Sequence, residues 1–264
     1  MPVSSRDALC EKLAWDTDFW GFRVARVIGD MLTPERVHEI DRWCQDKHIT
    51  CLYFLARADD DATIRAAESA GYHRVDTRVT LDWQPGPIRP TRPSRTAIRP
   101  HCRDDVDVLA RISGESHHDT RFWNDPGFPR AGCRALYESW IRNSCHGWAQ
   151  IVLVAESGGQ PAGYVTCHLT TARAGPVGSI GLIAVDESAR GVGLGEALVS
   201  AAQGWLAGHG ATYVTVVTQG ANQAALALYR RRGFQVESTC LWYHRWFPAI
   251  PAGSSATGES EVEG

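Results

Sequence analysis

An arginine and three alternating glycines stand immediately before a helical pattern. They are Arg190, Gly191, Gly193 and Gly195, within the stretch DESARGVGLGEAL at 186–198. A helix N-terminus has free N–H groups and a partial positive charge, and glycine lets backbone approach a ligand closely. A simple loop needs fewer glycines, since each one costs backbone entropy. The stretch therefore predicts a pyrophosphate cradle, with Arg190 adding charge from the side.

Two common phosphate-binding templates do not fit this loop. No Lys-Ser or Lys-Thr pair follows the glycines, as a nucleoside-triphosphate P-loop would require. A dinucleotide fingerprint needs an early position and an acidic residue after the second strand. This loop comes late in the chain, and the next predicted strand ends in Thr218-Gln219-Gly220.

The spacing Arg-x-x-Gly-x-Gly fits a third template. A second pattern follows it across one strand, and its residues are Asn222, Ala225, Tyr229, Gly233 and Phe234. In this order the two motifs resemble the acetyl-CoA-binding core of the GCN5-related N-acetyltransferases (GNAT). The resemblance covers roughly residues 97–245 and implies acetyl-CoA as cosubstrate.

The resemblance also implies roles for individual residues. The loop amides hold the pyrophosphate of CoA, and the strand before the loop pairs with pantetheine like an added strand. Asn222 bonds CoA or its neighbouring backbone, although an N-cap role alone would explain it. The implied cofactor-binding residues are Ile183, Ala184, Val185, Arg190, Gly191, Val192, Gly193, Leu194, Gly195 and Asn222.

Tyr229 is the candidate catalytic acid. A phenol with a pKa near 10 can donate a proton to a leaving thiolate whose conjugate acid has a pKa of about 8–9. The alternative is a core aromatic residue on an amphipathic helix. Asn222, seven residues earlier, favours the acid role because it completes the motif.

Three further segments extend the resemblance over nearly the whole chain. They are LAWDTDFWGFRVARV near the start, TRFWNDPGF with LYESWIRNS in the middle, and ESTCLWYHR near the end. They resemble the TDP-fucosamine acetyltransferases, which acetylate the 4-amino group of dTDP-4-amino-4,6-dideoxygalactose. The resemblance implies direct acetyl transfer to the amine of a dTDP-linked amino-dideoxysugar.

The acceptor-binding residues and the base are less clearly marked. Arg121 could meet a diphosphate and Trp123 could stack on a ring, whereas the alternative is a hydrophobic plug between domains. Thr218 and Gln219, at a strand end, could hold the sugar or cap the strand. His117, His118, Asp119 and Glu115 are the candidate bases, with His117 also a substrate contact; a water chain could equally carry the proton.

The fold class predicted is α/β (α+β), with a GNAT domain behind a smaller N-terminal domain. The predicted parts are 1–83, an α/β domain; 84–100, a proline-rich linker; 101–248, the GNAT domain; and 249–264, a disordered tail. Residues 66–77 resemble residues 226–239, since both contain the end of a helix, a glycine followed by an aromatic residue, and then a strand. This similarity suggests that the first domain is a truncated GNAT-like unit without the ligand loop.

Hydrophobic periodicity predicts the individual elements. Strands are expected at 22–29, 51–58, 73–83, 150–157, 161–171, 178–188, 212–220 and 241–247. Helices are expected at 33–48, 60–72, 105–117, 133–145, 195–210 and 222–234, with an aromatic loop at 121–129. Thr33 is the expected N-cap of the first helix, followed by Pro34.

Composition narrows the partners. The net charge of −3 gives no basic field for nucleic acid or an anionic membrane, so neither is expected as a partner. The N-terminus lacks a signal-peptide core and no long apolar run exists, which predicts a cytoplasmic protein. Eight cysteines without a C-x-x-C pair predict reduced thiols and no metal. A homodimer is compatible with this fold but has no pattern of its own.

Two rival functions stay open at this point. One is an N-acetyltransferase for another small amine or a peptide amine, because a fold alone does not fix the acceptor. The other is a CoA-binding sensor without turnover, against which Tyr229 argues. A covalent acyl-cysteine at Cys167 is a third route, although a strand cysteine is most often a core residue.

Overall fold

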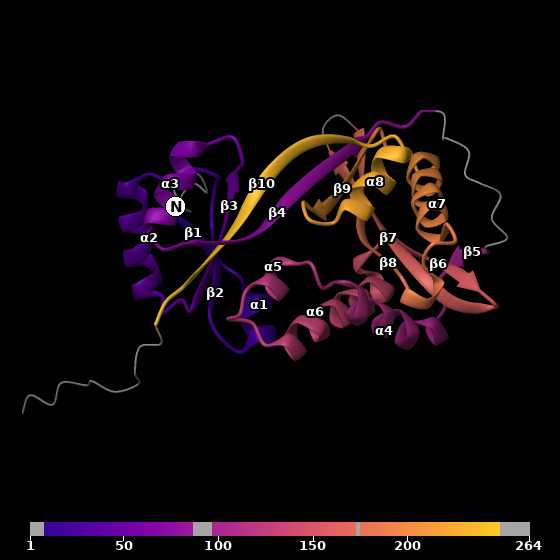
Figure 1. The fold of residues 1–264 in the computed structure, drawn as a ribbon, viewed down its shortest axis with the longest axis horizontal. Helices are drawn as coiled ribbons and strands as arrows, with labels where there is room; N and C mark the ends of the chain where they lie inside the picture. The colour runs from indigo at the N-terminus through magenta and orange to yellow at the C-terminus, as the bar shows by residue number, and fades with distance from the viewer. Residues whose placement is uncertain (1–7, 87–96, 173–174, 249–264) are drawn as a thin grey trace, which may run out of the picture.

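The computed structural model describes residues 8–86, 97–172 and 175–248 (Figure 1). Its strands form one ten-stranded sheet in the order β1-β2-β3-β10-β4-β9-β8-β7-β6-β5, flanked by helices. The prediction of a mixed α/β fold is therefore confirmed. No helix in the described part of the chain is long and apolar enough to cross a membrane.

The bounds of the elements follow. The strands are β1 Cys10–Lys12, β2 Val24–Val27, β3 Cys51–Arg57, β4 His73–Trp83, β5 Ile98–Pro100, β6 Ile151–Ser157, β7 Gln160–Ala172, β8 Gly175–Val185, β9 Tyr213–Gln219 and β10 Gln235–Trp246. The helices are α1 Ala14–Trp20, α2 Pro34–Asp46, α3 Asp61–Ser69, α4 Val106–Ser116, α5 Arg121–Asn124, α6 Arg130–Asn143, α7 Leu194–Gly208 and α8 Gln223–Arg231.

Most of the predicted elements are present, and local chemistry explains their ends. Thr33 caps α2 by accepting a hydrogen bond from the Arg36 N–H at 3.3 Å, with Pro34 at the first helical position. The predicted hairpin is formed by β6 and β7, which pair in antiparallel register across Gly158-Gly159. Both glycines have positive φ, which the tight connection requires.

Five elements differ from the sequence prediction. The strand β1 and the helix α1 were not predicted, and residues Ile98–Pro100 of the predicted linker form the edge strand β5. Residues Arg121–Asn124 of the predicted loop form the short helix α5, capped by Thr120. The strand β10 begins at Gln235, because its polar first half pairs with β4 rather than lying in a loop. Residues 87–96 of the linker and the tail 249–264 lie outside the described residues.

Two long central strands, β4 and β10, join the halves of the chain. The strand β4 lies between β9 and β10, and β10 lies between β4 and β3. Each half therefore places one strand beside a strand of the other half, and β4 and β10 run side by side through the centre of Figure 1. Strands from both sides of the predicted domain boundary after residue 83 belong to one continuous sheet.

The helices cover the two faces of the sheet in separate groups. The helices α2, α3, α7 and α8 pack on one face, here called the α7 face, with core residues such as Leu241, Val214 and Leu81. The helices α1, α4, α5 and α6 lie on the opposite face, here called the α6 face, against residues such as Tyr53 and Tyr164. Because side chains alternate along a strand, this division fixes which face each strand residue serves.

Candidate active site

The glycine loop enters α7 through two left-handed residues. Gly191 has φ +82° and Gly193, the N-cap residue of α7, has φ +91°. A Cβ atom built at either position would meet no heavy atom within 4 Å. Glycine is therefore required here by backbone conformation, and open space adjoins the free N–H groups at the start of the helix.

Arg190 lies between the end of β8 and the end of α4. Its Nε donates to the Val185 carbonyl at 3.1 Å, and its Nη2 lies 3.5 Å from the Ser116 Oγ. The base of the loop is held by Asp186, which accepts from Ser188 and from the Arg111 guanidinium at 2.7 Å. These contacts, the Ser188 hydrogen bond first, lower the pKa of Asp186 to about 2.

The parallel strands β8 and β9 pair over only part of their length. Their register runs from Val177↔Tyr213 to Ile180↔Val216 and ends there, although β8 continues to Val185. The other edge of β8 stays paired with β7 up to Val185. The segment Ile183–Val185 therefore has no strand partner on its β9 side in the described sheet. Such an edge is a template for an extended ligand.

A bulge bends β8 at the point where it leaves β9. The register against β7 shifts between Val165↔Ile183 and Cys167↔Ile180, which leaves Gly181 and Leu182 both on the α6 face. The Leu182 N–H donates to the Thr166 Oγ1 at 2.8 Å. A Cβ on Gly181 would lie 2.6 Å from the His168 Nε2, so this close approach requires glycine. The sequence pattern did not single out this residue.

Tyr229 lies in the core on the α7 face. The side chain is 2% exposed, and its ring packs against Phe234 with centroids 5.7 Å apart. No hydrogen bond to its hydroxyl is found among the described residues. Burial raises the pKa of Tyr229 well above its usual value, so the phenol keeps its proton at any working pH. Asn222 caps α8 by accepting from the Ala225 N–H at 3.0 Å, as its structural alternative predicted.

The two polar residues at the end of β9 face opposite sides of the sheet. Thr218 is 4% exposed and has the parity of Val214 and Val216, which places it on the α7 face. Gln219 lies on the α6 face, where its cross-strand partner is Arg78 of β4. The structure therefore separates two residues that the sequence grouped together.

The segment after α4 carries a half-buried histidine. The His117 ring stacks on Tyr137 at 4.4 Å, and its Nε2 lies 3.4 Å from the Tyr164 hydroxyl. Burial first, and the neighbouring His118 second, lower the pKa of His117 to about 4. Its imidazole is therefore neutral at pH 7 and a poor proton acceptor. His118 stacks on Trp123 at 4.5 Å.

Arg121 is held in an aromatic cage. Its guanidinium carbon lies 4.1 Å from the Tyr53 ring centroid, 4.3 Å from that of Phe122 and 4.2 Å from that of Trp242. Its Nη1 lies 3.2 Å from the Nε2 of His244, which is 0% exposed.

The tautomer of His244 follows from its two neighbours. Its Nδ1 lies 2.7 Å from the Asp125 Oδ2, so Nδ1–H donates to the carboxylate and Nε2 accepts from Arg121. Burial lowers the pKa of His244 to about 4, which keeps the ring neutral. The three residues form a chain that fixes the guanidinium in one place.

The sequence reasoning missed Asp76, a half-buried carboxylate on β4. It lies on the α6 face opposite Trp242, whose ring carries the Arg121 guanidinium. Burial raises the pKa of Asp76 to about 6, and hydrogen bonding to the Thr77 N–H and the Arg121 charge act in the other direction. Thr77 in turn accepts from the Gly220 N–H at 2.7 Å, so Asp76 adjoins the end of β9. An aspartate within an ordinary strand pattern gave no signal.

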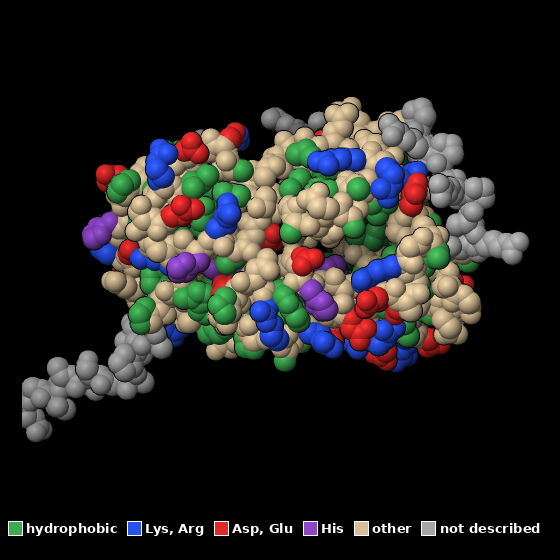
Figure 2. Space-filling model, viewed as in Figure 1, with side chains coloured by type: hydrophobic (Ala, Val, Ile, Leu, Met, Phe, Trp, Pro, Cys, Tyr) green, Lys and Arg blue, Asp and Glu red, His purple; other side chains and the backbone are tan. Residues whose placement is uncertain are grey.

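Figure 2 shows the surface hollowed near the middle of the molecule, with acidic and histidine side chains at the rim, in the region where Figure 1 places α5 below β9. The aromatic residues of α1 pack on the α6 face, with the Trp20 and Phe128 centroids 4.5 Å apart. Phe122 is 2% exposed and belongs to this packing.

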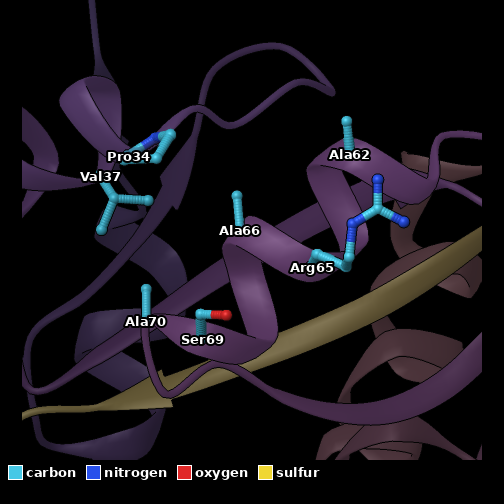
Figure 3. Close-up of a pocket in the computed structure, with 7 residues that line it drawn as sticks. All are labelled: Pro34, Val37, Ala62, Arg65, Ala66, Ser69 and Ala70. Carbon is cyan, nitrogen blue, oxygen red and sulfur yellow. The ribbon is translucent and has the colours of Figure 1, made fainter.

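Other groups lie apart from this region or are inert. Cys167 is 0% exposed, and burial raises its pKa to about 12, so it holds a neutral thiol. The groove in Figure 3 is lined only by residues of α2 and α3 and the residue after α3, on the other face of the sheet. No group of three potential metal ligands occurs among the described residues.

Comparison with known proteins agrees with this geometry. Residues 114–234 match the family model described as Acetyltransferase (GNAT) family. The chain is 27% identical over 254 residues to dTDP-fucosamine acetyltransferase of Escherichia coli O6:H1, covering 93% of this chain and 100% of the relative. It is 26% identical over 149 residues to the Bacillus subtilis spore coat polysaccharide biosynthesis protein SpsD, covering 54% of this chain and 48% of that protein.

Solved structures show the same fold. The GCN5-related N-acetyltransferase from Sphaerobacter thermophilus superposes with a TM-score of 0.61 at 19% identity, covering 91% of this chain and 77% of that one. A tandem GNAT protein from the clavulanic acid biosynthesis pathway gives a TM-score of 0.60 at 16% identity, with coverage of 87% and 76%. Residues 114–234, which include the glycine loop and the half-paired strands β8 and β9, therefore form an acetyltransferase domain of the GNAT family.

Proposed function

We propose that the enzyme transfers an acetyl group from acetyl-CoA directly to the amine of a dTDP-linked amino-dideoxysugar. The observation that carries the transfer is the free β8 edge beyond Ile180, which leads straight into the glycine loop. The nature of the acceptor is supported by similarity over nearly the whole chain to an enzyme named for a dTDP-sugar substrate.

The donor follows the path from the β8 edge to the loop. Ile183, Ala184 and Val185 offer backbone groups to pantetheine, and the residues Arg190–Gly195 offer N–H groups and a cation to the pyrophosphate. Asn222 fixes the start of α8 beside this path. Tyr229 gives its proton to the CoA sulfur as the C–S bond breaks, so that CoA leaves as a neutral thiol. The phenolate then regains a proton from solvent when the products leave, which restores the acid.

The acceptor approaches from the α6 face. Its neutral amine forms the new C–N bond with the thioester carbonyl carbon and then releases one proton. We assign Asp76 as the group that takes this proton, because its raised pKa makes it a stronger base than an ordinary aspartate while still ionised at pH 7. His117 fits this task poorly, since its lowered pKa disfavours the imidazolium form.

In this proposal the acceptor side is lined by Arg121, Trp123, His117 and Gln219. Thr218 packs on the α7 face of β9 and does not contact the acceptor.

The proposal keeps the predictions of a cytoplasmic location, no metal, a domain boundary near residue 83 and no nucleic-acid or membrane partner. A homodimer stays a prediction that gel filtration with light scattering can test.

Thiol release from acetyl-CoA tests the proposal. The acceptor panel should contain dTDP-4-amino-4,6-dideoxygalactose, its 3-amino isomer, a polyamine and a short peptide. Saturable release with a dTDP-sugar supports the proposal, and the preferred isomer identifies the amine position. Saturable release with only the polyamine or the peptide refutes it.

A further inference from the structure

A second arginine stands beside Asp76 on the same face of the sheet. Residues alternate along β4, with Val79 and Leu81 in the core of the α7 face. Asp76, Arg78 and Thr80 therefore share the α6 face. Neither sequence motif included Arg78.

The Arg78 cation has no counter-ion among the described residues. Its Nη1 donates to the Thr80 Oγ1 at 3.1 Å, and no carboxylate of the described chain lies within ion-pair distance of it. Its cross-strand partner Gln219 supplies a neutral amide. Since a half-buried cation is destabilising without a partner, the site favours an anion.

Arg78 is also the more available of the two arginines near Asp76. Aromatic rings cover the guanidinium of Arg121, and its Nη1 donates a hydrogen bond to the Nε2 of His244. The strip around Arg78 is partly open: Val217, opposite Thr80, is 39% exposed, although Thr80 itself is 7% exposed.

We propose that Arg78, with Gln219 opposite it, binds the diphosphate of the nucleotide-sugar acceptor, with the sugar lying between Arg78 and Asp76. The inference rests on the proposed function. Residues two apart on a strand are about 7 Å apart, which is comparable to the span of a hexose ring from its amine to its anomeric phosphate. A guanidinium also matches two phosphate oxygens at once.

The test compares Arg78→Gln, which removes the charge, with Arg78→Lys, which keeps it. Arg65→Gln is the matched control, because Arg65 is exposed on α3 on the opposite face (Figure 3). Each enzyme is assayed with dTDP-4-amino-4,6-dideoxygalactose, with the methyl glycoside of the same amino sugar, and with dTDP as a competitive inhibitor.

R78Q should raise the KM for the nucleotide sugar, and the Ki for dTDP, by about 10- to 100-fold. R78K should lose less, because it retains a point charge. The KM for acetyl-CoA and the slow turnover of the methyl glycoside should stay at the wild-type level in both variants. R65Q should behave as wild type throughout.

Two results would overturn the inference, and they have different meanings. If wild type acetylates the nucleotide sugar but R78Q keeps its KM and the dTDP Ki, the diphosphate binds elsewhere and the proposed function stands. If R78Q lowers the rate of acetylation of the methyl glycoside by the same factor, Arg78 supports the structure of the sheet rather than binding the diphosphate. Failure of wild type to acetylate any nucleotide sugar refutes the proposed function itself.

Discussion

Ile180 of β8 and Val216 of β9 are the last paired residues of two parallel strands that both continue beyond them. The bulge at Gly181 follows at once and turns β8 away from its neighbour. The free edge of β8 lies beside this gap, with Tyr229 on the α7 face of the sheet and Asp76 on the α6 face. In the proposed function, a thioester in this gap would have the acid on one side and the base on the other.

Replacing Tyr229 by Phe removes the proton donor and leaves the packing. We expect kcat to fall by about 100-fold or more, with the Kd of acetyl-CoA changed little. Steady-state kinetics and calorimetric titration measure the two quantities. Tyr72→Phe is the control, since its buried hydroxyl also lacks a partner among the described residues. Unchanged kcat in Y229F would remove the acid role.

Gly193→Val should abolish CoA binding. A side chain there strains the left-handed backbone by about 1–2 kcal/mol and occupies the space beside the helix N-terminus. Gly210 follows the other end of α7 and is a matched control, since it has φ +82° and equally open surroundings. Both valine variants should lower Tm alike, yet only G193V should lose CoA. A normal Kd in G193V contradicts the cradle.

Asp76→Asn should lower kcat/KM for the acceptor by about 100-fold or more. The wild-type profile of kcat/KM should break near the pKa of about 6, with activity lost below it, and D76N should lack this break. The break persisting in D76N would assign the base to another group.

The same substitution changes stability in the opposite direction. The folded pKa of Asp76, about 6, is raised from its ordinary 3.8, so the folded state binds the proton more tightly. Wild-type stability therefore falls as pH rises from about 4 to about 6. D76N should be more stable than wild type at pH 7 and no more stable at pH 3.5, as thermal unfolding would show. An equal Tm difference at both pH values would contradict this.

Arg121→Gln should move the acidic break of kcat/KM to higher pH. The Arg121 charge lowers the pKa of Asp76, so its removal lets burial raise that pKa further. Arg121→Lys should keep the break near its wild-type position, since it keeps the charge. A shift in R121K as large as that in R121Q would point to a packing effect instead.

The donor half of the candidate site leaves a pattern in the sequence, because its constraints are local. Gly191 and Gly193 are needed for the backbone conformation that precedes a helix, and such a need leaves a motif. Asn222 caps α8 through a contact three residues away, which is equally local. The placement of β4 beside β9 is not local, so no pattern could reveal it.

The acceptor half depends on that long-range pairing. Asp76 becomes a candidate base only because β4 lies against the end of β9 and opposite Trp242. Its raised pKa comes from burial beneath elements that are remote in sequence. The histidines at 117 and 118 were the more visible candidates, but burial of His117 makes it a weaker base. Chemistry that depends on tertiary packing is therefore the part that sequence reasoning misses.

The most direct test of the account is the identity of the product. Wild-type enzyme should be incubated with carbon-13-labelled acetyl-CoA and dTDP-4-amino-4,6-dideoxygalactose, and the products analysed by mass spectrometry and NMR. The account predicts free CoA together with a nucleotide sugar that carries one labelled acetyl group as an amide on its amino nitrogen. Release of CoA without labelled sugar, or a label on a hydroxyl oxygen, would contradict it.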